Sequence, residues 1–154
     1  MKITIRRVNE NDWQTVQKIE QTVFDATQKF DPDLIMDYPT TEAGIKYYKS
    51  SISSKEKCVL LAEIDRVPAG YLIGGEFKYP YRSVIYGEIE GLGVMPDFRR
   101  MGIGSELVKE FRKWCVEKGY GKIYVNTHFD DERAVSFYKK HGLIPTDIVL
   151  IGKV

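Results

Sequence analysis

The stretch RRMGIGSEL at residues 99–107 constrains the fold more than any other part of the chain. An amphipathic helix is predicted to begin just after Gly102 and to run to about Lys118. Its apolar stripe recurs at helical spacing: Ile103, Leu107, Phe111 and Cys115. The runs at 83–95 and 122–128, on either side of this helix, are typical of strands. A strand, a helix and a further strand in this order imply a crossover that joins two parallel strands.

The rest of the chain predicts an otherwise antiparallel sheet with helices around it. A tight turn at Asp65–Pro68 is expected to join two of the strands as a hairpin. Further strands are expected at 2–8, 58–64, 69–79 and 147–154. Helices are expected to begin at Asn11 or Asp12, at Thr40 or Thr41, and at Asp131. This order of elements predicts one α+β, or mixed α/β, domain over residues 1–154.

The composition limits the kinds of partner. With 154 residues and a formal net charge of +1, the chain has no broad basic field for nucleic acid or for an anionic membrane. The opening MKITIRR lacks the apolar core of a signal peptide, and no apolar run approaches the roughly 20 residues of a membrane span. Cys58, in an expected strand, and Cys115, in the expected helix, are expected to be buried thiols. Neither has the spacing of a metal ligand. We therefore expect a cytoplasmic protein with no metal site, no nucleic-acid partner and no membrane contact.

The glycines and arginines at the start of the central helix predict an anion site. Gly102 and Gly104 lie where the first backbone N–H groups of a helix have no intrahelical partner. These donors, the helix dipole and the guanidinium groups of Arg99 and Arg100 together favour a phosphate. The alternative interpretation is a glycine-rich turn with solvated arginines.

Two familiar phosphate-binding motifs do not fit this loop. A Walker-type loop requires Gly-Lys-Ser/Thr, whereas Ser105 and Glu106 follow the second glycine here. The dinucleotide fingerprint requires a third glycine at the position that Leu107 occupies. The loop therefore indicates neither a nucleotide triphosphatase nor a nicotinamide enzyme.

The strand before the loop, YGEIEGLGVMP, contains more glycine than a packed strand needs. Glycines inside a strand mark a bulge or the close approach of a ligand or another backbone. A ligand held by its phosphates at the loop would lay an amide-bearing tail along residues 91–94, where it would pair like an extra strand. Glu88 and Glu90 project from one face of this strand, unless a bulge intervenes. Two carboxylates there would take protons or attract a cation, and a solvated polar face is the alternative.

Two separated stretches, LGVMPDFRRMGIGSEL and DERAVSFYKKHGL, together resemble the Gcn5-related N-acetyltransferases (GNAT). The specific match covers roughly residues 86–143, and the order of elements fits nearly the whole chain. The resemblance implies the GNAT fold, a twisted, mostly antiparallel sheet with a central pair of splayed parallel strands, flanked by about four helices. It also implies that acetyl-coenzyme A (acetyl-CoA) is the acetyl donor.

The resemblance assigns the parts of the donor to particular residues. The pyrophosphate is expected on the loop, and the pantetheine between the splayed strands. The thioester carbonyl is expected to meet backbone N–H groups of the strand before the loop. Asp131 stands where the family often has asparagine, so its contact with pantetheine is expected to be changed. The implied donor-binding residues are Leu92, Gly93, Val94, Arg99, Arg100, Met101, Gly102, Ile103, Gly104, Ser105, Asp131, Ala134 and Tyr138.

The resemblance also implies a mechanism, in which a primary amine attacks the thioester directly in a ternary complex. Such an amine is protonated at neutral pH and must lose a proton first. Glu88 matches the position of the base in the histone-modifying branch of the family, and Glu90 is the alternative. Tyr138 matches the usual proton donor to the departing thiolate.

The acceptor and the oligomeric state stay open at this point. The acceptor is a small cationic amine, such as a polyamine or an aminoglycoside, or a protein lysine or N-terminus. The alternative function is a CoA-binding sensor or structural module of the same fold with little catalysis. We expect a monomer or a homodimer.

Overall fold

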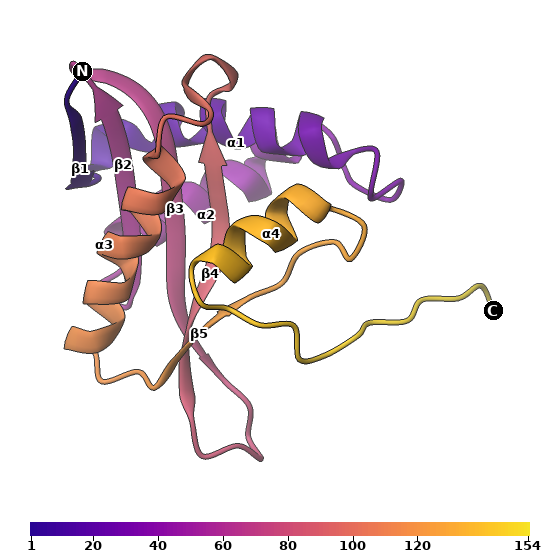
Figure 1. Ribbon diagram of the computed structural model, residues 1–154. Coiled ribbons are helices and arrows are strands. Elements are labelled where there is room, and N and C mark those ends of the chain that lie inside the picture. The colour runs from indigo at the N-terminus through magenta and orange to yellow at the C-terminus, as the bar shows by residue number, and fades with distance from the viewer.

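A five-stranded sheet forms the centre of the protein, whose computed structural model describes all residues 1–154 (Figure 1). The strands follow one another across the sheet in chain order, and each of the first four is antiparallel to its neighbour. β5 runs parallel to β4, as the crossover predicted. The strands are β1 (Ile3–Arg7), β2 (Lys57–Ile64), β3 (Val67–Lys78), β4 (Ile85–Val94) and β5 (Lys122–Val125).

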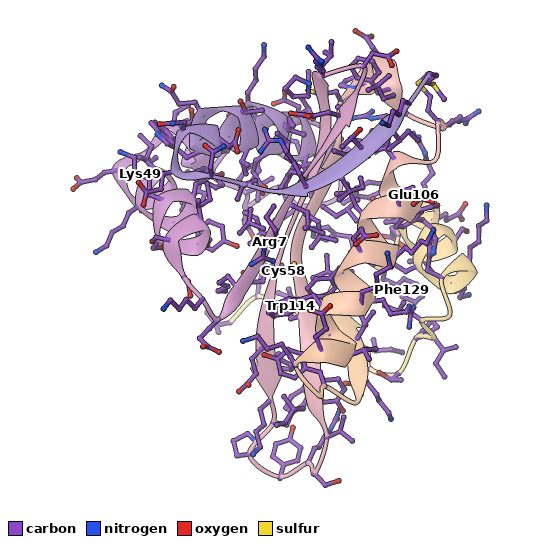
Figure 2. All side chains as sticks on the ribbon, turned by 90° about the vertical axis from the view of Figure 1, so that its left-hand side faces the viewer. Arg7, Lys49, Cys58, Glu106, Trp114 and Phe129 are labelled. Atoms are coloured by element: carbon purple, nitrogen blue, oxygen red, sulfur yellow. The ribbon has the colours of Figure 1, made fainter.

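Four α-helices cover the two faces of this sheet, two on each side (Figure 2). Short 3-10 turns lie at Glu10–Asp12, Tyr38–Thr40 and Pro96–Phe98. Thr41 caps α2, because its hydroxyl accepts a hydrogen bond from the Gly44 N–H. The helices are α1 (Trp13–Thr27) and α2 (Glu42–Ser53) on one face, and α3 (Ile103–Glu117) and α4 (Glu132–Lys140) on the other.

The sheet separates two apolar cores. The core under α1 and α2 consists of Val16, Ile19, Tyr48, Val59, Leu61, Tyr71 and Ile73. The core under α3 is larger and contains the predicted stripe Ile103, Leu107, Phe111 and Cys115 together with Cys58 of β2, and Trp114 packs against this core. Burial raises the pKa of Cys58 to about 11 and that of Cys115 to about 12. Both thiols are free and buried, so the expectation of buried thiols is confirmed.

The strand expected at 147–154 does not form. The chain leaves α4 at Gly142 and runs away from the sheet, and residues 147–154 pair with no strand (Figure 1). Ile148, Val149, Leu150 and Ile151 are 72–92% exposed. A strand needs a neighbour for its backbone and its side chains, and apolar residues alone do not supply one. As a result, the parallel pair lies at an edge of the sheet and not at its centre.

No helix of the structure is long and apolar enough to cross a membrane.

Candidate active site

β4 and β5 pair over only part of the length of β4. The register joins Tyr86–Ile89 to Lys122–Val125, and β5 ends there. β4 continues to Val94, still paired with β3 on its other side. Residues 90–94 therefore present an edge of the backbone that no strand of the protein covers, at the position where the sequence places an amide-bearing ligand.

A β-bulge at Glu90 and Gly91 shapes this open edge. Ile73 of β3 pairs with Gly91, and the next residue, Gly74, pairs with Ile89, so Glu90 is the extra residue. Glu90 is exposed as a residue, but its side chain alone is only 20% exposed. Most of its exposed surface therefore belongs to the backbone, which faces solvent. Gly91 is required here by packing: a Cβ would lie 2.8 Å from the Tyr71 hydroxyl oxygen.

The two glutamates of β4 project toward the same face of the sheet, as predicted. Gly87 and Ile89 face α3, so Glu88 between them faces the side of α1 and α2. Glu90 reaches α2 on that side, where Tyr47 donates a hydrogen bond of 3.0 Å to it.

Their surroundings differ. Glu90 forms an ion pair with Lys57 in addition to the Tyr47 hydrogen bond. Glu88 is partly buried and makes neither contact. Burial is the main cause that raises the pKa of Glu88 above its usual range, and the nearby Glu90 carboxylate adds to it, while Lys57 opposes it. Glu88 is therefore the carboxylate better suited to accept a proton.

The loop before α3 exposes a run of backbone donors. No backbone N–H from Arg100 to Ser105 donates a hydrogen bond to another group of the protein. Arg100 and Gly102 both have positive φ, 64° and 86°, and left-handed residues of this kind occur in the backbone turns that bind anions. A Cβ on Gly102 would meet no other atom within 4 Å, so the space beside this residue is open. Such a run of donors at a helix N-terminus is an anion-binding site.

The two arginines beside this loop have different positions. The Arg99 Nε donates a hydrogen bond of 3.2 Å to the Val94 carbonyl oxygen, which ties the loop to the end of β4. Arg100 is exposed and its side chain makes no contact with a polar group of the protein. This hydrogen bond occupies only the Nε of Arg99, so the terminal nitrogens of both guanidinium groups remain available to bind an anion.

α4 packs against the same edge of the sheet from the α3 side. The Asp131 carboxylate caps this helix by accepting a hydrogen bond of 3.0 Å from the Ala134 N–H. Tyr138 is partly buried against the α3 core, and burial, with a smaller effect of Asp131, raises its pKa to about 12. His141 lies 3.0 Å through Nε2 from the Ser105 hydroxyl and so joins the end of α4 to the start of α3.

One carboxylate at this site was missed by the sequence analysis. Glu20 of α1 lies against Gly91 of β4, and burial raises its pKa to about 7. The signal was present in the sequence, because Glu20 falls at helical spacing between Val16 and Val23, on the stripe that faces the sheet.

Comparison with known proteins supports this architecture. A model of the acetyltransferase (GNAT) family matches residues 16–143. The chain is 30% identical to acetyltransferase ECA0875 of Pectobacterium atrosepticum over 94 residues, which are 61% of this chain and 62% of that protein. It is 28% identical to acetyltransferase YE1169 of Yersinia enterocolitica over 94 residues, with the same shares. The match therefore spans less than two thirds of the length of these relatives.

Solved structures of similar shape agree over the whole chain. A point mutant of the BH1408 protein from Bacillus halodurans superimposes with a TM-score of 0.87 at 17% identity, covering 98% of this chain and 99% of that one. The aminoglycoside N-acetyltransferase AAC(6')-Iy, in complex with a bisubstrate analogue, gives a TM-score of 0.77 at 16% identity, covering 100% and 99%. At these identities the likeness shows the fold. Because the family model matches most of the sequence, this protein belongs to the GNAT acetyltransferase family.

Proposed function

We propose that the protein is an N-acetyltransferase that moves the acetyl group of acetyl-CoA to a primary amine of a small cationic acceptor. The observation that carries this proposal is the run of unpaired N–H groups from Arg100 to Ser105, next to the uncovered edge of β4 at residues 90–94. Phosphates need the first feature and an amide-bearing tail needs the second. Acetyl-CoA contains both groups in the same molecule.

The residues present fit the donor. In this proposal the pyrophosphate accepts hydrogen bonds from the loop, and the free guanidinium of Arg100 adds a charge-assisted contact. The pantetheine lies along the open edge of β4, and the thioester carbonyl meets backbone N–H groups between Leu92 and Val94. The same N–H groups stabilise the oxyanion that forms when the carbonyl is attacked. Structures of AAC(6')-Iy with CoA support the assignment of this ligand class to the fold.

The acceptor side of the proposed site is the face that α1 and α2 cover. Glu88 and Glu90 both project there, and the Tyr47 ring lies beside them. Carboxylates and an aromatic ring favour a cationic amine over a neutral or acidic acceptor. The aminoglycoside acetyltransferases among the structures of similar shape support the same class of acceptor.

The proposed chemistry follows from these positions. Glu88 removes the proton of the acceptor ammonium through a water, because it is the carboxylate without an ion pair. The neutral nitrogen attacks the thioester carbon, a C–N bond forms, the nitrogen loses its second proton to water, and the C–S bond breaks. Tyr138, which is protonated at neutral pH, gives its proton to the departing thiolate and regains one from water.

A panel of amines tests this proposal. Purified protein is incubated with acetyl-CoA and, in turn, polyamines, aminoglycosides, lysine amide and a lysine-containing peptide, and the released thiol is measured. We expect thiol release above the background hydrolysis with at least one small cationic amine. Release with the peptide alone would contradict the acceptor class, and release with none of the amines would contradict the function.

A further inference from the structure

Glu20 is a carboxylate that the proposed chemistry leaves unused. It lies within the apolar stripe of α1, next to Ile19 and in line with Val16 and Val23 of the same stripe. Burial is the one cause that shifts its pKa, since no cation pairs with it and no donor of the protein reaches it. The loss of hydration of a carboxylate is costly unless a partner compensates for it.

A buried hydroxyl group converges on the same place. Tyr71 of β3 is fully buried, and its hydroxyl has no hydrogen-bond partner within the protein. A Cβ built on Gly91 would lie 2.8 Å from the Tyr71 Oη and 3.3 Å from the Glu20 Oε2. Two unpartnered oxygens, one of them charged, therefore meet beside Gly91 from two different elements.

This place lies close to the proposed reaction centre. Gly91 directly precedes Leu92, where the thioester carbonyl is proposed to bind. Glu88 lies four residues earlier on the strand. Because Glu90 is the extra residue of the bulge, this stretch spans three residues of β3, from Leu72 to Gly75, which is on the order of 10 Å at about 3.3 Å per residue. An amine that attacks the thioester from the α1 and α2 side is therefore nearer to Glu20 than to Glu88.

We propose that Glu20 and Tyr71 form the binding site for the ammonium group of the acceptor. The inference rests on the proposed N-acetyltransferase function and names the group that this site recognises. A primary ammonium has three N–H donors, of which the Glu20 carboxylate and the Tyr71 hydroxyl oxygen accept two. A trimethylammonium group has none and is rejected. The bound ammonium passes its proton through water to Glu88, and the neutral nitrogen then attacks the thioester carbon.

The pH dependence follows from the charge of Glu20. The carboxylate is ionised above about pH 7 and neutral below it, so it attracts an ammonium only in the upper range. The groups that lie near Glu20 from the neighbouring elements are Tyr47 and Tyr48 of α2 and Tyr71 of β3. The Tyr47 hydroxyl also contacts Glu90, which is paired with Lys57. Burial raises the pKa of Tyr47 and Tyr48 further above neutral pH, so neither of these two tyrosines changes charge together with Glu20 near pH 7.

The test compares Glu20→Gln with wild type by steady-state kinetics from pH 5.5 to pH 8.5. The acceptors are 1,4-diaminobutane and n-butylamine, with acetyl-CoA saturating. The kcat/KM of wild type divided by that of Glu20→Gln should be near one at pH 5.5 and at least ten at pH 8. The difference should lie in KM and not in kcat. Tyr71→Phe should raise KM several-fold by the same factor at every pH. Glu117→Gln, an exposed glutamate of α3 on the opposite face of the sheet, is the matched control and should leave both constants unchanged.

A kcat/KM ratio that stays constant with pH would overturn the inference, and so would a difference that lies in kcat instead of KM. A merely structural role of Glu20 gives either result. A second measurement applies even if neither amine is acetylated, which would be the failure of the proposed function. The carboxyl carbon of Glu20 is followed by nuclear magnetic resonance, with CoA bound. Addition of 1,4-diaminobutane should lower the pKa of Glu20, while n-butyltrimethylammonium should not. An unchanged titration with 1,4-diaminobutane would refute the ammonium site.

Discussion

Two glycines that flank α3 allow the phosphate site to be tested by a matched pair of substitutions. Gly102 precedes the first residue of the helix and Gly119 follows its last turn, with φ of 86° and 75°. A Cβ at either position would meet nothing within 4 Å. Gly102→Ala and Gly119→Ala therefore introduce the same backbone strain, about 1–2 kcal/mol for an L-residue in the left-handed conformation, without a clash.

The two substitutions should differ in donor binding. The methyl group on residue 102 would stand within the run of free N–H groups, whereas the one on residue 119 lies at the far end of the helix. If the methyl group separates the pyrophosphate from two donors, each worth about 1.5–3 kcal/mol as a charge-assisted hydrogen bond, the loss is about 3 kcal/mol or more. That loss corresponds to a dissociation constant at least roughly 100-fold higher.

Calorimetric titration with acetyl-CoA measures this difference, and thermal unfolding measures the strain. We expect both variants to lose similar stability, and only Gly102→Ala to lose affinity, with Gly119→Ala within about threefold of wild type. Equal affinities of the two variants would refute the assignment of the phosphate site to this loop.

The remaining predictions concern proton transfer. Glu88→Gln should lower kcat roughly 10²–10⁴-fold, with the affinity for acetyl-CoA unchanged, because positioned bases contribute in that range. Glu90→Gln, which removes the partner of Lys57 and Tyr47, should lower kcat less than about tenfold. If initial-rate measurements show the larger loss of kcat for Glu90→Gln instead of Glu88→Gln, Glu90 is the base. Tyr138→Phe should lower kcat by a constant factor of about tenfold or more between pH 6 and pH 10, because a pKa of about 12 keeps the phenol protonated throughout. A loss confined to the alkaline end of the pH–rate profile would contradict that role.

The local signals predicted most of the elements. Helical spacing of Ile103, Leu107 and Phe111 placed α3, and Thr41 marked the start of α2. The order of elements around α3 predicted a parallel pair, which β4 and β5 form. These features depend on residues close together in the chain, where periodicity and capping act.

Features that depend on distant residues were not predictable in this way. The run 147–154 has the composition of a strand, yet whether it pairs depends on a neighbour that the sequence of the run does not specify. Glu20 and Gly91 are 71 positions apart, and only the packing of α1 on β4 brings them together. The glycines of β4 suggested a ligand nearby, whereas Gly91 is needed because Tyr71 leaves no space for a side chain.

The Arg99 side chain shows the same limit. Its charge indicated a phosphate ligand, whereas the hydrogen bond from its Nε to the carbonyl of Val94, which leaves its terminal nitrogens unpaired, was not predictable. A residue type indicates which contacts are chemically possible, and the fold determines which of them is made. The backbone donors of the loop were predicted more securely, because every helix N-terminus leaves such groups unpaired.

The central claim is that the protein transfers an acetyl group from acetyl-CoA to an amine. The most direct measurement quantifies both products of one reaction, the free thiol of CoA by a colorimetric assay and the N-acetylated amine by mass spectrometry, with the best acceptor of the panel. We predict one equivalent of acetylated amine for each equivalent of thiol, formed only in the presence of the protein. Thiol without acetylated amine, or tight binding of acetyl-CoA with neither product, would contradict the account.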